Sequence, residues 1–222
     1  MKIKTIAISV TAFVLLGGVI GVQQYISSQI TSKVQREMPN ASGISASVPL
    51  ADVPGNLTSD SIKSADINIK SFALKESGTK TSLDISASSI SKAKPTLIGS
   101  LEVTATIPAS TITKQSEFNN AQIVGNTLQV AAGAGGMGTA LLIPKFSNNQ
   151  LYFELQSVSI FGNQIAASSL PADLQDQIKT KSQRSLTPPK GLKVKSVSLS
   201  SKGLSVRMSG NNIQLGNLGS GL

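Results

Sequence analysis

Nine segments of this 222-residue chain alternate apolar and polar residues, or nearly do so, and this pattern constrains the fold more than any other feature. A period of two is typical of a β-strand that buries one of its faces. The segments are 44–49, 67–74, 83–90, 97–107, 126–132, 138–144, 151–161, 192–199 and 204–215. Short gaps with turn residues such as Asn148-Asn149 separate many of them, so a mostly antiparallel sheet is predicted. Residues 108–118 are predicted to form a short helix or a turn.

In three of these segments the apolar phase slips once in mid-strand. The slips lie at Ser71, at Gln156-Ser157 and at Lys195-Ser196. A slip of one residue turns the apolar set to the other face unless a β-bulge absorbs the extra residue. Bulges bend strands and increase their twist, so the three slips predict a strongly curled sheet.

Residues 171–186 are predicted to form a long C-terminal helix. Pro171 suits the first turn, Asp173 and Asp176 lie near the start, and three basic residues lie near the end, which matches the helix dipole. A helix of this length spans about 24 Å, enough to lie along a curled sheet. A second helix is predicted over residues 23–38, either packed on the domain or extending a membrane helix.

The N-terminus is typical of an export signal. Lys2 and Lys4 precede residues 6–22, which are uncharged and mostly apolar. Residues 1–22 are therefore predicted to be an uncleaved membrane helix or a cleaved signal peptide, and a buried core helix is the third interpretation. Residues 23–222 are then a single extracytoplasmic domain, with a flexible tail over 216–222.

The positive charge is concentrated near the C-terminus. Residues 177–222 hold eight basic residues and no acidic one, whereas residues 23–176 hold ten basic and eleven acidic residues. Such a field attracts anions: lipid headgroups, acidic polymers or nucleic acid. Export, and the lack of aromatic residues among the basic ones, argue against nucleic acid. An anionic membrane surface is the expected partner.

The composition removes most catalytic chemistry. The chain contains no histidine and no cysteine, which excludes a Ser-His-Asp arrangement, a cysteine nucleophile, disulfides and nearly all zinc sites. Ser89-Ile-Ser-Lys92 has the S-x-x-K spacing but lacks its partner motifs, and the glycine-rich residues 131–138 lack the lysine of a phosphate loop. The sequence predicts a protein that is not an enzyme and has no catalytic residue, metal site or cofactor.

The C-terminal block has a recognisable order of residues. It runs Ser169-Leu-Pro-Ala-Asp-Leu174, a helix, Leu186-Thr-Pro-Pro-Lys-Gly-Leu-Lys-Val194, then Lys202-Gly-Leu-Ser-Val206 and Ile213-Gln-Leu215. This block resembles the LmeA-like family of bacterial envelope phospholipid-binding proteins. The resemblance implies an α+β fold like the tubular lipid-binding proteins. There, a strongly curled antiparallel sheet wraps a long helix and acyl chains occupy the groove between them.

Within that fold we expect two sets of contact residues. The acyl-chain groove would be lined by Phe153, Leu155, Val158, Ile160, Leu174, Ile178, Val197 and Leu199. The membrane or the headgroup would be contacted by Lys179, Lys181, Arg184, Lys193 and Lys195. The plainer interpretations are ordinary core for the first set and a solvated outer face for the second. The expected function is a non-enzymatic phospholipid binder or carrier anchored in the cell envelope, and the alternative is a surface-anchored β-rich structural or adhesion protein.

Overall fold

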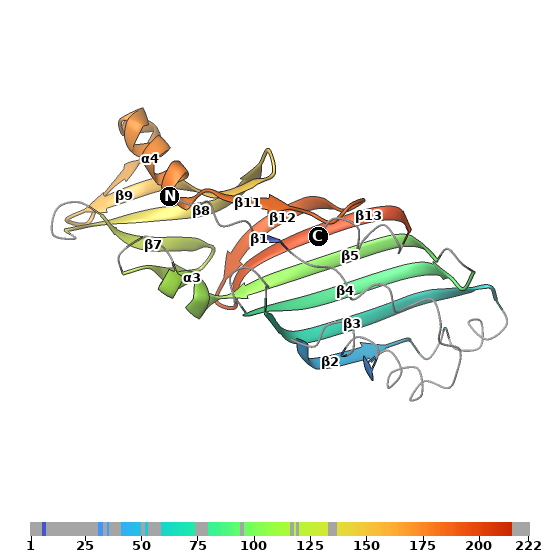
Figure 1. The fold of residues 1–222 in the computed structure, drawn as a ribbon. Helices are drawn as coiled ribbons and strands as arrows, with labels where there is room; N and C mark the ends of the chain where they lie inside the picture. Colours follow the sequence, from blue (N-terminus) through green and yellow to red (C-terminus); the bar gives the residue numbers. More distant parts are fainter. Residues whose placement is uncertain are drawn as a thin grey trace. The chain divides into compact units, whose positions relative to one another are not determined.

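The described residues form two β-sheets (Figure 1). The computed structural model describes residues 6–7, 31–32, 35, 41–49, 52, 59–73, 80–93, 96–115, 118, 120–132 and 137–214. These residues group into two compact units. Unit 1 takes in residues 1–6, 106–187 and 196–206, and unit 2 takes in residues 7–105, 188–195 and those from Arg207 onward. Four strands contribute residues to both units, and the single domain predicted for residues 23–222 stays a prediction.

Unit 1 is built around a seven-stranded sheet. Its strands lie in the order β1 (Ile6–Ala7), β11 (Arg184–Thr187), β9 (Gln150–Ile160), β8 (Gly138–Ser147), β7 (Thr127–Ala132) and β6 (Gln122–Val124), and β10 (Asn163–Ala166) also pairs with β9. The pairs β6–β7, β7–β8, β8–β9, β9–β10 and β9–β11 are all antiparallel, as predicted. Two α-helices, α3 (Ala109–Gln115) and α4 (Ala172–Ser182), and the 3₁₀ turn η4 (Ala167–Ser169) accompany the sheet.

The second sheet has six strands. Their order is β12 (Lys193–Ser200), β13 (Gly203–Gln214), β5 (Leu97–Pro108), β4 (Lys80–Ser91), β3 (Ser61–Ala73) and β2 (Ala41–Ser47). Strand β4 illustrates why the sequence alternates, because Leu83 and Ile85 are buried while Asp84 and Ser86 between them are exposed. One face of the strand therefore belongs to the core and the other faces solvent.

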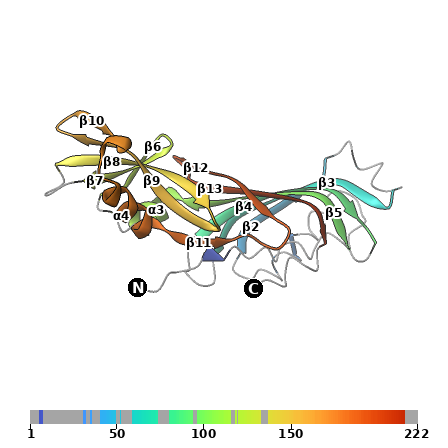
Figure 2. The ribbon, with the colours of Figure 1, turned by 90° about the horizontal axis from the view of Figure 1, so that it is seen from above.

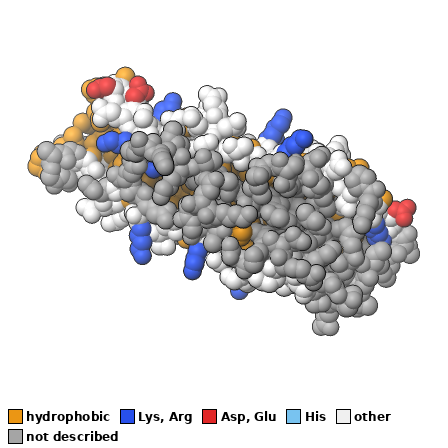
Figure 3. Space-filling view, viewed as in Figure 1, with side chains coloured by type: hydrophobic (Ala, Val, Ile, Leu, Met, Phe, Trp, Pro, Cys, Tyr) orange, Lys and Arg blue, Asp and Glu red, His pale blue; other side chains and the backbone are white. Residues whose placement is uncertain are grey.

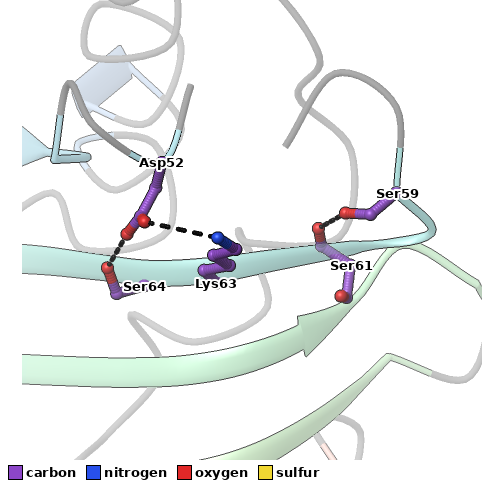
Figure 4. Close-up of polar contacts among 5 residues, drawn as sticks. All are labelled: Asp52, Ser59, Ser61, Lys63 and Ser64. Carbon is purple, nitrogen blue, oxygen red and sulfur yellow. Dashed lines mark hydrogen bonds and ion pairs between the residues drawn. The ribbon is translucent and has the colours of Figure 1, made fainter. Parts of the chain in front are cut away.

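Polar contacts fix the start of β3 (Figure 4). The Ser64 hydroxyl donates a hydrogen bond of 2.8 Å to Asp52, whose carboxylate also lies 3.9 Å from the Lys63 ammonium. The Ser59 hydroxyl donates to the carbonyl of Ser61 at 2.5 Å. These contacts tie the segment before the strand to its first residues.

The strand predictions are confirmed more fully than the helix predictions. Each of the nine alternating segments coincides with a strand, and residues 109–115 form the predicted short helix. Two of the three predicted bulges are present. The register of β3 against β4 shifts between Ile69 and Phe72. Strand β9 has one extra residue relative to β8 between Leu155 and Ser157. In β12, Lys195 and Ser196 are both exposed between the half-buried Val194 and Val197, as expected for a slip at this point. The third bulge itself stays a prediction.

The predicted fold class is wrong. The described sheets are not strongly curled, and no long C-terminal helix is wrapped by either of them (Figures 1 and 2). The two observed bulges lie in different sheets, so their bends do not add up in one sheet. The predicted helix over 171–186 ends at Ser182, and the chain continues as β11. Leu186 is buried in β11, and its backbone N–H donates a hydrogen bond of 2.9 Å to the carbonyl of Asn149.

The predicted membrane helix over 6–22 is also corrected where the structure describes it. Among the residues that the structure describes, no helix has the length and apolarity needed to cross a membrane. Of residues 6–22, only Ile6 and Ala7 are described, and they form strand β1. Of the predicted helix over 23–38, the described residues Thr31, Ser32 and Gln35 are helical. The rest of that helix and the tail over 216–222 lie outside the described residues.

Candidate functional site

Helix α4 and strand β9 bring six of the eight predicted groove residues into one region of unit 1. Phe153, Leu155, Val158 and Ile160 come from β9, and Leu174 and Ile178 come from α4. In both ribbon views α4 lies beside β9 (Figures 1 and 2). The remaining two, Val197 and Leu199, lie on β12 at the edge of the six-stranded sheet.

A buried serine joins α4 to β9. Ser182 lies at the end of α4, and its hydroxyl accepts a hydrogen bond of 2.9 Å from the backbone N–H of Phe153. The same hydroxyl bonds to the carbonyl of Ile178, one helical turn earlier, at 2.8 Å. Strand β9 is paired with β11 only at residues 150–151 and with β10 only at residues 157–160. Ser182 therefore provides a hydrogen-bond acceptor for the N–H of Phe153, which lies on the strand edge between these two pairings.

The six residues on α4 and β9 differ in exposure. Leu155 and Val158 are buried and belong to the core of the unit. Phe153 and Ile178 are half-buried, and Ile160 and Leu174 are exposed at 40% and 38%. Only the last four can touch a lipid without rearrangement, so the apolar surface is shallower than the predicted groove. On β12, Leu199 is buried and Val197 half-buried.

The predicted cations near this surface have different surroundings. The Lys179 ammonium lies 4.9 Å from the centre of the Tyr152 ring, a cation–π contact between α4 and β9. The Arg184 guanidinium donates to the carbonyls of Lys181 at 2.9 Å and Gln183 at 2.8 Å. Arg184 therefore satisfies carbonyls at the end of α4, where a positive charge also suits the helix dipole. Lys179 and Lys181 are exposed in the last turn of α4.

The predicted basic block is divided between the units. Lys179, Lys181 and Arg184 belong to unit 1, whereas Lys193, Lys195 and Arg207 belong to unit 2. Lys193 and Lys195 are exposed on β12, the edge strand of the six-stranded sheet. Lysines on an edge strand discourage pairing with other chains, which gives these two a structural role that needs no ligand. Arg207 bonds to Glu102 at 2.7 Å, and this hydrogen bond raises the pKa of the guanidinium.

A shallow hollow in unit 2 has the wrong chemistry for an acyl chain. Side chains of β2, β3 and β4 line it, among them Ser45, Asp66 and Asp84. The Ser86 hydroxyl donates to Asp66 at 2.6 Å, and the Asn68 amide donates to Asp84. These groups already satisfy one another, and an acyl chain placed over them would have to desolvate the two carboxylates.

Comparison with known proteins finds no match, since no protein-family model fits the chain and no curated protein or solved structure is similar to it.

Sequence reasoning missed three exposed apolar residues of unit 1. Val124 ends β6 and is 52% exposed. Met137 precedes β8 and is 60% exposed, and Phe161 follows β9 and is 78% exposed. Phe161 was included in a predicted strand, although it forms a turn with Gly162. Its place directly before the Gly162-Asn163 turn signal was the clue that an aromatic residue would lie on a hairpin tip.

Proposed function

We propose that this chain is a non-enzymatic phospholipid-binding protein of the cell envelope. One observation carries the proposal: α4 and β9 present half-buried and exposed apolar side chains next to two exposed lysines. Ile178 and Leu174 supply the apolar part, and Lys179 and Lys181 supply the charge. Acyl chains favour the first kind of surface and phosphate headgroups the second.

Two features of the sequence support the same function. The C-terminal block resembles the LmeA-like envelope proteins, and the positively flanked apolar residues 6–22 are typical of export. The proposal differs from the original expectation in the manner of binding. The described part of unit 1 has no curled sheet around a helix, so we propose contact with lipid at the α4–β9 surface.

The charge side of the proposal can be tested with matched lysine pairs. Replacing Lys179 and Lys181 by Gln removes two charges from α4, and replacing Lys193 and Lys195 by Gln removes the same number from β12. Each basic residue near an anionic membrane contributes about 1 kcal/mol at low salt. The α4 pair should therefore contribute about 2 kcal/mol, or about thirtyfold in vesicle affinity.

The assay is flotation of the full chain with phosphatidylglycerol and phosphatidylcholine vesicles. Residues 6–22 are common to all variants, so their effect cancels in the comparison. The α4 variant should lose affinity for the phosphatidylglycerol vesicles and not for the phosphatidylcholine vesicles, and this loss should be clearest at low ionic strength. The β12 variant should lose less affinity for the phosphatidylglycerol vesicles. Equal losses in the two variants would refute a headgroup contact at α4. If the wild-type chain ignored vesicles of both kinds, the structural or adhesion alternative would replace the proposal.

A further inference from the structure

One end of the seven-stranded sheet carries a cluster of exposed apolar side chains. The strand registers align Ala132, Gly138, Ile160 and Asn163 across β7, β8, β9 and β10. Met137 and Phe161 each lie one residue beyond this row. Met137, Ile160 and Phe161 are exposed at 60%, 40% and 78%, and we call these three residues the apolar tip. Figure 3 shows hydrophobic side chains gathered at the end of unit 1 that carries β7 to β9.

The strands that reach this end carry no charge near it. Residues 118–144 contain no Lys, Arg, Asp or Glu, and neither do residues 155–172. These two segments include β7, most of β8, the end of β9 and all of β10. An uncharged end with protruding apolar side chains can enter the hydrocarbon layer of a membrane without desolvating an ion, which would be costly.

The conformation of Phe161 is a second, independent observation. Phe161 and Gly162 have φ values of 50° and 82°, and they form the two-residue turn between Ile160 and Asn163. A turn with two positive φ values favours Asn or Gly, and a bulky aromatic residue there is strained. The other hairpin of β9 follows the rule, since its turn is Asn148-Asn149 with φ values of 53° and 56°. A side chain that is 78% exposed gains little from the rest of the protein to offset this strain.

We propose that the apolar tip inserts into the hydrocarbon layer of a phospholipid bilayer. This inference rests on the proposed function, because it identifies the bilayer as a partner of unit 1, and it adds a contact that needs no headgroup charge. A protein partner would normally be selected by charges or by a hydrogen-bond pattern around the apolar centre. The tip has no charge to offer, and a bilayer requires none. Asn163 and Gln164 are exposed beside the tip, where uncharged polar groups meet the headgroup layer.

The absence of cysteine allows a local test in the full chain. Met137→Cys, labelled with an environment-sensitive fluorophore, reports on the tip alone, even if residues 6–22 hold the chain on the vesicle. Asn149→Cys is the matched control, because it lies in the exposed turn at the opposite end of β9. Vesicles of phosphatidylcholine are used, with a spin label on the acyl chain of a fraction of the lipid.

The label at residue 137 should shift to the blue and be quenched by the spin-labelled lipid, and the label at residue 149 should do neither. Adding Phe161→Asn to the Met137→Cys chain should reduce the fraction inserted by about tenfold, because a large buried aromatic side chain is lost. The same change should raise the midpoint of thermal unfolding by about 2–4 °C, since it relieves the positive-φ strain. Val124→Ser, which removes a comparably exposed apolar residue from β6, should leave insertion unchanged.

Three results would overturn the proposal. The first is equal signals at residues 137 and 149, and the second is unchanged insertion of the Phe161→Asn chain. The third is a blue shift that needs no vesicles and grows with protein concentration, because it would assign the tip to a second copy of the chain. Failure of the proposed function is distinguishable from these. If the chain inserts its tip and yet retains no phospholipid on purification, the proposed α4–β9 contact is contradicted, whereas the proposal for the apolar tip still holds.

Discussion

Gly203 is the first residue of β13 and packs against the backbone at the end of β5. Replacing it by alanine should destabilise the chain strongly. Its φ is 134°, a conformation that residues with a side chain rarely adopt. A Cβ at this position would lie 1.9 Å from the carbonyl oxygen of Ile107 and 2.8 Å from the backbone nitrogen of Ala109. Both neighbours are backbone atoms, so no side-chain rotation can relieve the overlap. The backbone must separate, and the hydrogen bond of 3.1 Å from Ala109 N–H to the Lys202 carbonyl is lost with it.

The magnitude follows from these two effects. Strain at a forbidden φ costs about 1–3 kcal/mol, and a lost hydrogen bond costs about 1 kcal/mol more. Gly203→Ala should therefore lower the free energy of unfolding by about 2–4 kcal/mol. Gly125→Ala is the matched control, because Gly125 also has a positive φ, 60°, and a Cβ there meets no atom within 4 Å. It should cost about 1 kcal/mol, the strain of the left-handed conformation alone.

Urea unfolding of both variants, followed by far-ultraviolet circular dichroism, measures the difference. The reasoning predicts a clearly lower midpoint for Gly203→Ala than for Gly125→Ala. Equal midpoints would mean that β5 and β13 do not approach each other as described.

Three further outcomes are expected. Ser182→Ala should cost about 1–3 kcal/mol of stability in the same urea assay, because it leaves the part-buried N–H of Phe153 without its acceptor; no loss would show that α4 does not close this edge of β9. Thr81→Val should be neutral or stabilising by up to about 1 kcal/mol, because the buried Thr81 hydroxyl has no hydrogen-bond partner within the described part of the chain; a marked loss would reveal a partner for that hydroxyl. Protease added to intact spheroplasts should digest the chain if the export signal predicted for residues 1–22 directs it outside the cytoplasm, and full protection would contradict that prediction.

The sequence predicted the strands well because their signal is local. An alternating segment such as that of β4 records which face is buried, and each alternating segment became a strand. The strands that were missed are β1, β6, β10 and β11, of two to four residues each, too short to contain a period. Residues 184–186, the first three of β11, were assigned to the preceding helix. Leu186 fitted its apolar stripe, and only the pairing with β9, which is far away in the sequence, reveals the strand.

Curvature could not be predicted in the same way. The slips in β3 and β9 correctly predicted two bulges, and a bulge is a property of one strand and its neighbour. Whether the bends add up depends on which strands share a sheet, and that information is not local. The α4–β9 surface was predicted only in part, again because sheet membership is not local information. The residues of each element were identified from their periodicity, whereas the grouping of Val197 and Leu199 with them was an assumption about sheet membership.

The measurement that tests the phospholipid proposal most directly is mass spectrometry of the lipid retained by the purified full chain. Ile178→Asp introduces a charge into the half-buried part of the α4–β9 surface, and Gln177→Asp introduces the same charge at the exposed neighbouring position. The wild type and Gln177→Asp should retain a defined phospholipid, and Ile178→Asp should lose it while its circular dichroism stays that of a folded β-rich protein. If all three proteins carried the same lipid, or none carried any, α4 and β9 would not form a phospholipid site.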